Sequence, residues 1–167
     1  MYTRQTSYLR WLLWAAVLLW AGLIFYMSAQ ASGSSSAMSR GFIRSAASLF
    51  PPFREMSEPE QLGLISALNT LVRKAAHWSL YFVLGSFSAL LSRCYPLSCR
   101  TRTLLVPGSC LLYALSDEWH QYFVPGRSCE LRDVLIDFCG ASTGALLIFL
   151  VLFLLSRKKR SASRTTG

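Results

Sequence analysis

Two long apolar runs constrain this chain more than any other feature of its sequence. Residues 9–27 (LRWLLWAAVLLWAGLIFYM) and residues 134–155 (VLIDFCGASTGALLIFLVLFLL) carry few charged side chains. A helix needs about 20 residues to cross the hydrocarbon core of a bilayer, and both runs supply them. The sequence therefore predicts a membrane protein in which both runs are strong candidates for spanning helices.

Two further segments are weaker candidates for spanning helices. Residues 75–92 are long enough but carry His77 near their start, and residues 103–123 are interrupted by Pro107-Gly108. The composition agrees with a membrane protein, because 53% of the residues are hydrophobic and only 15% are charged. We predict an all-α fold, a polytopic bundle of about four spanning helices in a single domain over residues 1–167, with three spans as the alternative.

The first apolar run could also be a cleavable signal peptide. Basic residues precede it, and Ala29-Gln30-Ala31 resembles a small-residue cleavage site. However, the run is longer than the roughly 7 to 15 residues of a usual signal core, and it contains bulky Trp residues. We therefore predict an uncleaved membrane anchor.

Basic residues beside the apolar runs predict the orientation in the membrane. They gather in three segments: Arg4 and Arg10; Arg93, Arg100 and Arg102; and Arg157, Lys158, Lys159, Arg160 and Arg164. With four spans all three segments fall on one side, so the positive-inside rule places both termini in the cytoplasm. Segments 28–72 and 116–133 are mixed in sign and are assigned outside. The net charge of +9 thus indicates topology, and we expect no nucleic-acid partner.

The outer segment 28–72 is predicted to hold one amphipathic helix. SGSSS (32–36) is interpreted as a flexible linker and Pro51-Pro52 as a break. Ser57 and Glu60 have the spacing of a capping box, so a helix should begin there and lie on the membrane surface or on the bundle. A soluble-facing linker helix is the alternative. Residues 156–167 are predicted to be a disordered basic cytoplasmic tail.

Ionisable side chains concentrate at the predicted outer ends of three helices. Each segment has a polar stripe at helical spacing: Arg73, His77 and Tyr81; Asp117, His120 and Gln121; and Asp133 and Asp137. Such groups are costly in a bilayer unless they face the bundle interior, a partner or water. We therefore expect the three stripes to converge on one outward-opening polar pocket.

Three segments resemble the motifs of VanZ-like membrane proteins: FYMSAQ (25–30), RKAAHWSLYFVLG (73–85) and SDEWHQYFVPGRSCELRDVLIDFCGASTG (116–144). The resemblance covers roughly residues 22–146. It implies a small helical bundle of the bacterial plasma membrane, in a family named for a component of glycopeptide-resistance clusters associated with low-level teicoplanin resistance. It implies no established reaction. Many relatives have Glu immediately before Tyr81, where this chain has Leu80.

The polar positions implied by the resemblance fall into three groups. The first carries imidazole or carboxylate chemistry and supplies the catalytic candidates: His77, Asp117, Glu118, His120, Asp133 and Asp137. The second supplies the ligand-binding candidates: Ser28, Gln30, Arg73, Lys74, Tyr81, Ser116, Gln121 and Arg127. The third shapes the backbone: Pro125 and Gly126 as a turn, and Gly140 and Gly144 as a G-x-x-x-G contact between helices.

The catalytic candidates have three interpretations. They could form a network of ion pairs that locks the bundle, a metal-free site with His120 or His77 as general base, or a metal site. The network is favoured, and no familiar zinc signature is present. The five cysteines are odd in number and lack C-x-x-C spacing, which predicts neither a disulfide framework nor a thiolate metal cage. No metal ligand is assigned, and the cofactor is unknown.

The basic and aromatic residues near the pocket each have two interpretations. Arg73, Lys74 and Arg127 could clamp a phosphate or carboxylate, or extend to lipid headgroups. The aromatic residues are predicted to form an interfacial belt rather than a platform for a sugar: Trp78, Trp119, Tyr122 and Phe123.

Two function classes follow. The first is an envelope protein that lowers susceptibility to teicoplanin-type glycopeptides, with the lipid bilayer and a cell-wall precursor or glycopeptide as partners. The second is a membrane-embedded hydrolase or transferase acting on a lipid-linked or phosphorylated envelope precursor. A transporter is disfavoured, because the charged residues gather at one face.

Overall fold

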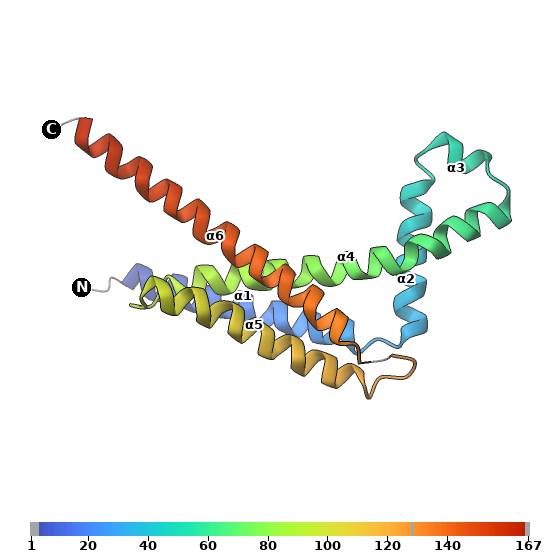
Figure 1. Cartoon of the computed structure of the whole chain (residues 1–167), viewed down its shortest axis with the longest axis horizontal. Coiled ribbons are helices and arrows are strands. Elements are labelled where there is room, and N and C mark those ends of the chain that lie inside the picture. The colour runs from blue at the N-terminus through green and yellow to red at the C-terminus, as the bar shows by residue number, and fades with distance from the viewer. Residues whose placement is uncertain (1–3, 128, 166–167) are drawn as a thin grey trace.

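The computed structural model describes residues 4–127 and 129–165, which form α-helices and no strands (Figure 1). The helices are α1 (Arg4–Ser28), α2 (Ser32–Ala47), α3 (Pro51–Glu55), α4 (Glu58–Ser92), α5 (Cys99–Gln121) and α6 (Leu131–Thr165). The predicted all-α fold is therefore confirmed for the described residues.

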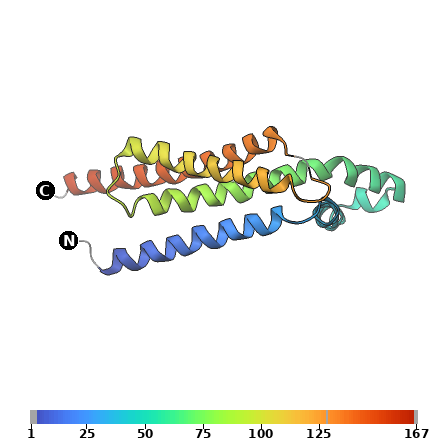
Figure 2. The same cartoon turned by 90° about the horizontal axis from the view of Figure 1, so that it is seen from below.

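The helices α1, α4, α5 and α6 contact one another and run side by side as a bundle (Figures 1 and 2). α1 and α5 run in one direction, while α4 and α6 return in the other. The first turn of α1, the α4–α5 turn and the last turn of α6 consequently lie toward the same end of the molecule. α2 crosses the opposite end at a steep angle to the bundle, and the C-terminal half of α6 diverges from its neighbours.

Two described segments are long and apolar enough to cross a membrane, Ser7–Ser28 of α1 and Leu131–Lys158 of α6. In the apolar 18-residue window of each segment, only 17% and 22% of the residues, respectively, are buried within the structure. Large apolar side chains such as Leu19 and Leu146 point outward. Because the core helix of a soluble protein is mostly buried, this exposure indicates that the two helices need an external apolar environment such as a bilayer.

The other two candidate spans fall short by composition. Among the described helices, the segments at 75–92 in α4 and 103–121 in α5 are not apolar enough to count as membrane spans by composition. Both carry polar or small residues that are buried inside the bundle, including Gly85 in α4 and Asp117 and Gln121 in α5. Such residues lower the hydropathy without facing lipid. Composition therefore supports two spans, and the four-span bundle is not confirmed by it.

Three expectations for the outer segment and the tail are wrong. SGSSS is the first part of α2, where packing of Ile43 on Phe53 and Ile65 stabilises a helix despite the poor helix propensity of Gly and Ser. The amphipathic helix is continuous with the second apolar segment, so both belong to α4. The tail is helical as far as Thr165, since no Gly or Pro interrupts α6 after Gly144.

The predicted start of the helix at SEPE is correct. Ser57 is the N-cap of α4, and the Glu60 carboxylate accepts hydrogen bonds from the Ser57 amide at 2.8 Å and from its hydroxyl at 2.7 Å. These two hydrogen bonds hold the pKa of Glu60 below its usual value. Pro51 and Pro52 begin α3, so they separate it from α2 as expected. The side chains of Arg4, Lys159, Arg160 and Arg164, used in the orientation argument, lie outside the part of the chain whose side chains are described.

Close backbone contact holds α4 against α6. A Cβ added at Gly140 would meet the backbone of Trp78, one at Gly144 would meet that of Phe82, and one at Gly85 would meet that of Ala141. These contacts let the two helices approach to backbone distance, as small residues do in membrane bundles. The predicted packing role of Gly140 and Gly144 is therefore confirmed.

We expect Gly144→Ala to lower the free energy of unfolding by about 1–3 kcal/mol, because the added methyl group has no space against Phe82. Gly22→Ala in α1 is the matched control, since nothing lies within 4 Å of a Cβ there. The control should be neutral or stabilise by up to about 1 kcal/mol through helix propensity. Unfolding of the purified protein in mixed micelles provides the measurement. Equal effects of the two substitutions would contradict the proposed packing.

Candidate functional site

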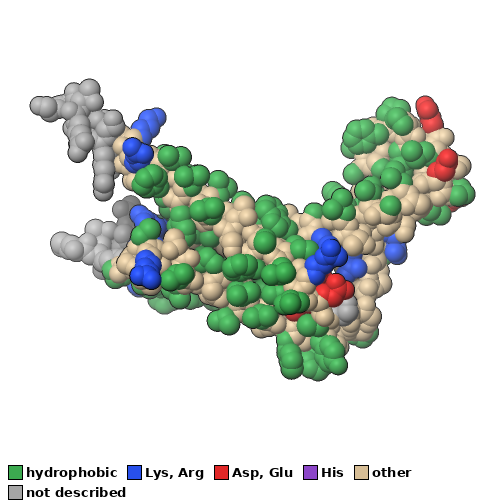
Figure 3. Space-filling view, in the orientation of Figure 1, with side chains coloured by type: hydrophobic (Ala, Val, Ile, Leu, Met, Phe, Trp, Pro, Cys, Tyr) green, Lys and Arg blue, Asp and Glu red, His purple; other side chains and the backbone are tan. Residues whose placement is uncertain are grey.

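A polar pocket of about 420 Å³ lies at the end of the bundle next to α2. Its wall includes Arg73, Lys74 and His77 of α4, Arg127 of the α5–α6 loop and Asp133 of α6. Figure 3 shows basic and acidic side chains meeting at this end, surrounded by apolar surface. The structure thus brings residues from three separate polar segments of the sequence into one place.

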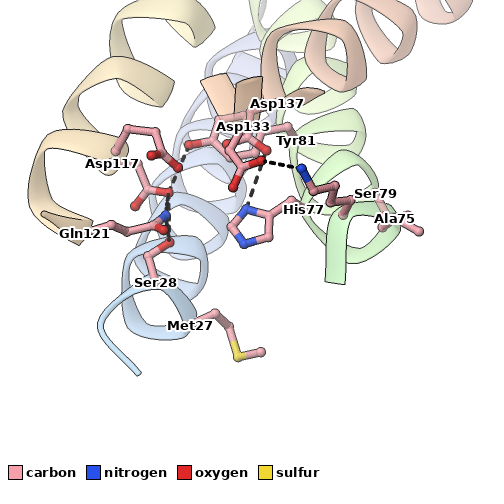
Figure 4. A network of polar contacts seen from close by, with 12 residues as sticks. Met27, Ser28, Ala75, His77, Ser79, Tyr81, Asp117, Gln121, Asp133 and Asp137 are labelled. Carbon is pink, nitrogen blue, oxygen red and sulfur yellow. Dashed lines mark hydrogen bonds and ion pairs between the residues drawn. The ribbon is translucent and has the colours of Figure 1, made fainter. Parts of the chain in front are cut away.

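Asp117 joins three helices at the base of this region (Figure 4). Its Oδ2 atom accepts hydrogen bonds from Ser28 Oγ of α1 at 2.8 Å, Gln121 Nε2 of α5 at 3.2 Å and Tyr81 Oη of α4 at 3.4 Å. The residue is only 2% exposed. Its Oδ1 atom has no hydrogen-bond partner among the described residues. Asp117 therefore fixes the relative positions of α1, α4 and α5.

Arg127 attaches the α5–α6 loop to the end of α1. Its Nη1 donates to Gln121 Oε1 at 2.8 Å, while Nε and Nη2 donate to the backbone carbonyls of Gln30 at 3.0 Å and Met27 at 3.3 Å. Gly126 precedes it with a φ of +73°, which confirms the predicted turn and explains the glycine. The side chain of Gln30 bonds the Tyr26 carbonyl of its own helix, so only its backbone contributes here.

Two pairs of a basic and an acidic side chain connect α4 with α6, one helical turn apart. Lys74 Nζ lies 3.2 Å from Asp133 Oδ1, and both side chains are 28% exposed. His77 Nδ1 lies 3.5 Å from Asp137 Oδ1, where Asp137 is completely buried and His77 faces the pocket. At this separation neither oxygen of Asp137 makes a hydrogen bond within the described residues. The second pair therefore has a buried carboxylate behind a partly accessible imidazole.

Eight of the expected site residues do not line the pocket: Ser28, Gln30, Tyr81, Ser116, Asp117, Glu118, His120 and Asp137. The ring of His120 stacks on Phe25 of α1 at 4.3 Å between centroids, and His120 does not line the pocket. Ser116 is exposed and donates to the Tyr113 carbonyl of its own helix. Buried Glu118 accepts the Glu130 backbone amide at 3.0 Å, so it anchors the segment that leads into α6. The rotation of α5 directs Asp117 and Gln121 inward and turns the side chains of Ser116, Glu118 and His120 elsewhere.

Several pocket residues were not anticipated from the sequence: Ser32, Thr70, Glu130, Arg132 and Ile136. Thr70 could have been found, because it lies one helical turn before Lys74 on the same face. Ser32 could not, since its position depends on how α2 folds back over the end of the bundle.

The aromatic residues of the predicted belt are all at the surface. Trp119, Tyr122 and Phe123 expose about two thirds of their area, and Trp78 is stacked on Phe82 with its outer part exposed. Their positions fit a boundary between lipid and water.

No group of three or more His, Cys, Asp or Glu side chains comes together in a metal-binding arrangement in residues 4–127 and 129–165. The five cysteines are free. The described pocket offers basic side chains, the carboxylates of Glu130 and Asp133, and one imidazole backed by the buried carboxylate of Asp137.

The His77–Asp137 and Lys74–Asp133 pairs should differ in coupling energy. In a double-mutant cycle of His77→Ala and Asp137→Ala, we expect a coupling energy of about 1 kcal/mol or more, because Asp137 is buried. The equivalent cycle of Lys74→Ala and Asp133→Ala should give about 0.5 kcal/mol, since partly exposed ion pairs are weak. Free energies of unfolding in mixed micelles would test this. A coupling for His77 and Asp137 no larger than that of the control pair would contradict the arrangement.

Comparison with known proteins supplies the family. The VanZ/LLP1 family model matches residues 13–154, which is nearly the whole chain and includes every pocket residue. Comparisons with curated proteins and with solved structures give no match. The matched region extends from the first apolar helix to the last, with the polar pocket at one end of the bundle between them. The chain therefore belongs to the VanZ/LLP1 family.

Proposed function

We propose that this protein crosses the bacterial plasma membrane four times, with both termini in the cytoplasm and the polar pocket open to the outside. The described basic residues Arg10, Arg93, Arg100 and Arg157 belong to the end of the bundle opposite the pocket. The positive-inside rule assigns that end to the cytoplasm. α4 and α5 lie within the same bundle as the two apolar helices, which supports spans for all four.

The contacts of α1 support retention of the first helix as an anchor. Ser28 donates to Asp117, and the carbonyls of Met27 and Gln30 accept from Arg127. Cleavage after Ala31 would remove all three groups and leave Asp117 and Arg127 without these partners. A folded pocket of this form needs α1.

The function that we propose is binding of an anionic component of the cell envelope, which lowers susceptibility to teicoplanin-type glycopeptides. The observation that carries this proposal is the pocket itself, whose wall contains Arg73, Lys74, Arg127 and Arg132 at the predicted outer end of the bundle. Glycopeptides act outside the membrane on cell-wall precursors. A protein with an outward-facing basic pocket could meet such precursors, whereas an inward-facing site could not.

A second candidate is a membrane-embedded hydrolase or transferase that acts on a lipid-linked or phosphorylated envelope precursor. The His77–Asp137 pair favours it, because a carboxylate behind an imidazole is the usual arrangement of an oriented general base. At the position where many relatives carry Glu, this chain has Leu80, which lines an apolar groove next to the pocket and supplies no carboxylate.

The topology can be tested with the native cysteines. Cys129 is exposed in the α5–α6 loop and Cys99 is exposed at the start of α5. We expect a membrane-impermeant maleimide to label a variant that retains only Cys129 in intact cells. The variant that retains only Cys99 should react only after the cells are permeabilised. Labelling of Cys99 in intact cells, or protection of Cys129, would exclude the proposed orientation.

The resistance role can be tested by expression in a susceptible Gram-positive host. We expect the wild-type protein to raise the minimum inhibitory concentration of teicoplanin, and Asp117→Asn and Arg127→Gln to return it to that of the empty vector. His120→Phe is the matched control, because it keeps a ring against Phe25 and lies outside the pocket. Membrane abundance of each variant must be equal. If the wild-type protein is abundant in the membrane but does not raise the minimum inhibitory concentration, the resistance proposal is wrong.

The variant His77→Gln separates the two candidates. A general base is needed only for turnover, so His77→Gln would abolish an enzymatic effect while leaving ligand binding largely intact. If binding alone confers tolerance, the His77→Gln variant should retain both ligand binding and teicoplanin tolerance.

A further inference from the structure

A second cavity shares part of its wall with the polar pocket. It is an apolar groove of about 470 Å³ between α1, α2 and α4, and its wall includes Ile24, Met38, Phe42 and Leu80. Three side chains line both cavities: Arg73, His77 and Arg127. The polar pocket and the apolar groove therefore meet at these basic residues, which we call the seam.

Arg73 is the member of the seam that has a buried donor without a hydrogen-bond partner among the described residues. Arg127 donates to Gln121 and to backbone carbonyls, and His77 lies against Asp137. The Nε atom of Arg73 is buried and has no hydrogen-bond partner among the described residues. A buried guanidinium donor without an acceptor is unfavourable, and a guanidinium binds phosphate or carboxylate oxygens through parallel hydrogen bonds.

The charge of the polar pocket favours an anion. Four basic side chains line it, against the acidic side chains of Glu130 and Asp133. Asp133 is already paired with Lys74. The basic residues therefore outnumber the acidic ones, and the pocket complements a multiply charged group such as phosphate better than it complements a cation.

The groove has the opposite character. Apart from the three residues of the seam, its wall contains no charged side chain and includes Met, Ile, Leu, Val and Phe. Its volume lies within the range of roughly 300–1,000 Å³ that is usual for sites that enclose small molecules. A polar ligand would use only the pocket, and a purely apolar one would use only the groove. An amphiphile is the class of ligand that uses both.

We propose that the protein binds a lipid whose phosphate group contacts Arg73 at the seam, with the rest of the headgroup in the polar pocket and the hydrocarbon chain in the groove between α1, α2 and α4. This inference rests on the proposed binding function of the pocket and names the chemical class of its ligand. It assigns the groove a role that the pocket alone does not require.

Binding can be measured with the full-length protein in neutral detergent, by native mass spectrometry with farnesyl phosphonate. Its carbon–phosphorus bond resists hydrolysis, so turnover cannot obscure binding. We expect Arg73→Gln to weaken binding by about tenfold, which is the effect of losing one charge-assisted hydrogen bond. Ala76→Trp, which fills the groove, should also weaken binding. Arg44→Gln is the matched control, because Arg44 is an exposed residue of α2 that lines neither cavity.

Farnesol and inorganic phosphate distinguish the two halves of the ligand. We expect farnesol to bind much more weakly than the phosphonate, and phosphate to compete poorly. Equal binding of farnesol would show an apolar groove without an anion site, and complete competition by phosphate would show an anion site without a chain site. Either result, or an unchanged affinity in Arg73→Gln, would overturn the inference. Binding without teicoplanin tolerance would leave it standing and contradict only the resistance role.

Discussion

The site depends on the close approach of α4 and α6, which their glycines permit. Gly140 lies against Trp78, the residue after His77, and it follows Asp137 by less than one helical turn. Where the helices touch backbone to backbone, the side chains just beyond the contact are brought within reach of one another. The His77–Asp137 separation of 3.5 Å and the Lys74–Asp133 separation of 3.2 Å follow from this spacing. Larger residues at the contact would separate the helices and leave Asp137 buried without its imidazole, which is costly in an apolar environment.

A second constraint is the concentration of unsatisfied polar atoms at the pocket end. Asp117 Oδ1, Glu118 Oε1, Arg73 Nε and both carboxylate oxygens of Asp137 are buried without hydrogen-bond partners among the described residues. Each such atom costs about 1–3 kcal/mol. At the other end, Ala89, Val106 and Ala145 form an ordinary apolar cluster between α4, α5 and α6. Stability therefore comes from the apolar and glycine contacts, while the pocket end retains buried polar atoms whose hydrogen-bonding capacity is not used among the described residues. This uneven distribution is compatible with the functional site proposed above.

The sequence predicted the helical class, the capping box at Ser57, the G-x-x-x-G contact and the segments that supply the polar residues, because each depends on local spacing. It could not predict how far α5 is rotated about its axis. Asp117, His120 and Gln121 lie within about one turn, so spacing alone allows all three to face inward. Packing against α1 decides which of them face inward. Ser28 donates a hydrogen bond to Asp117, whereas the ring of Phe25 stacks on that of His120. The helical start of α2 was missed for a related reason, because the burial of Ile43 against distant residues outweighs the local preference of SGSSS.

The residues that build the pocket also explain why hydropathy distinguishes α1 and α6 from α4 and α5. Helices that expose most of their surface to lipid must be apolar over that surface, as α1 is and as α6 is after its first two turns, which carry Asp133 and Asp137. A helix between them can place polar side chains on faces that its neighbours cover. α5 buries Asp117, Glu118 and Gln121 in this way, and α4 supplies Arg73, Lys74 and His77 to the pocket. Each of these residues lowers mean hydropathy and none of them has to contact acyl chains. A test based on composition therefore overlooks α4 and α5, because their polar residues are turned toward the site. The four-span proposal is compatible with the low hydropathy of these two helices.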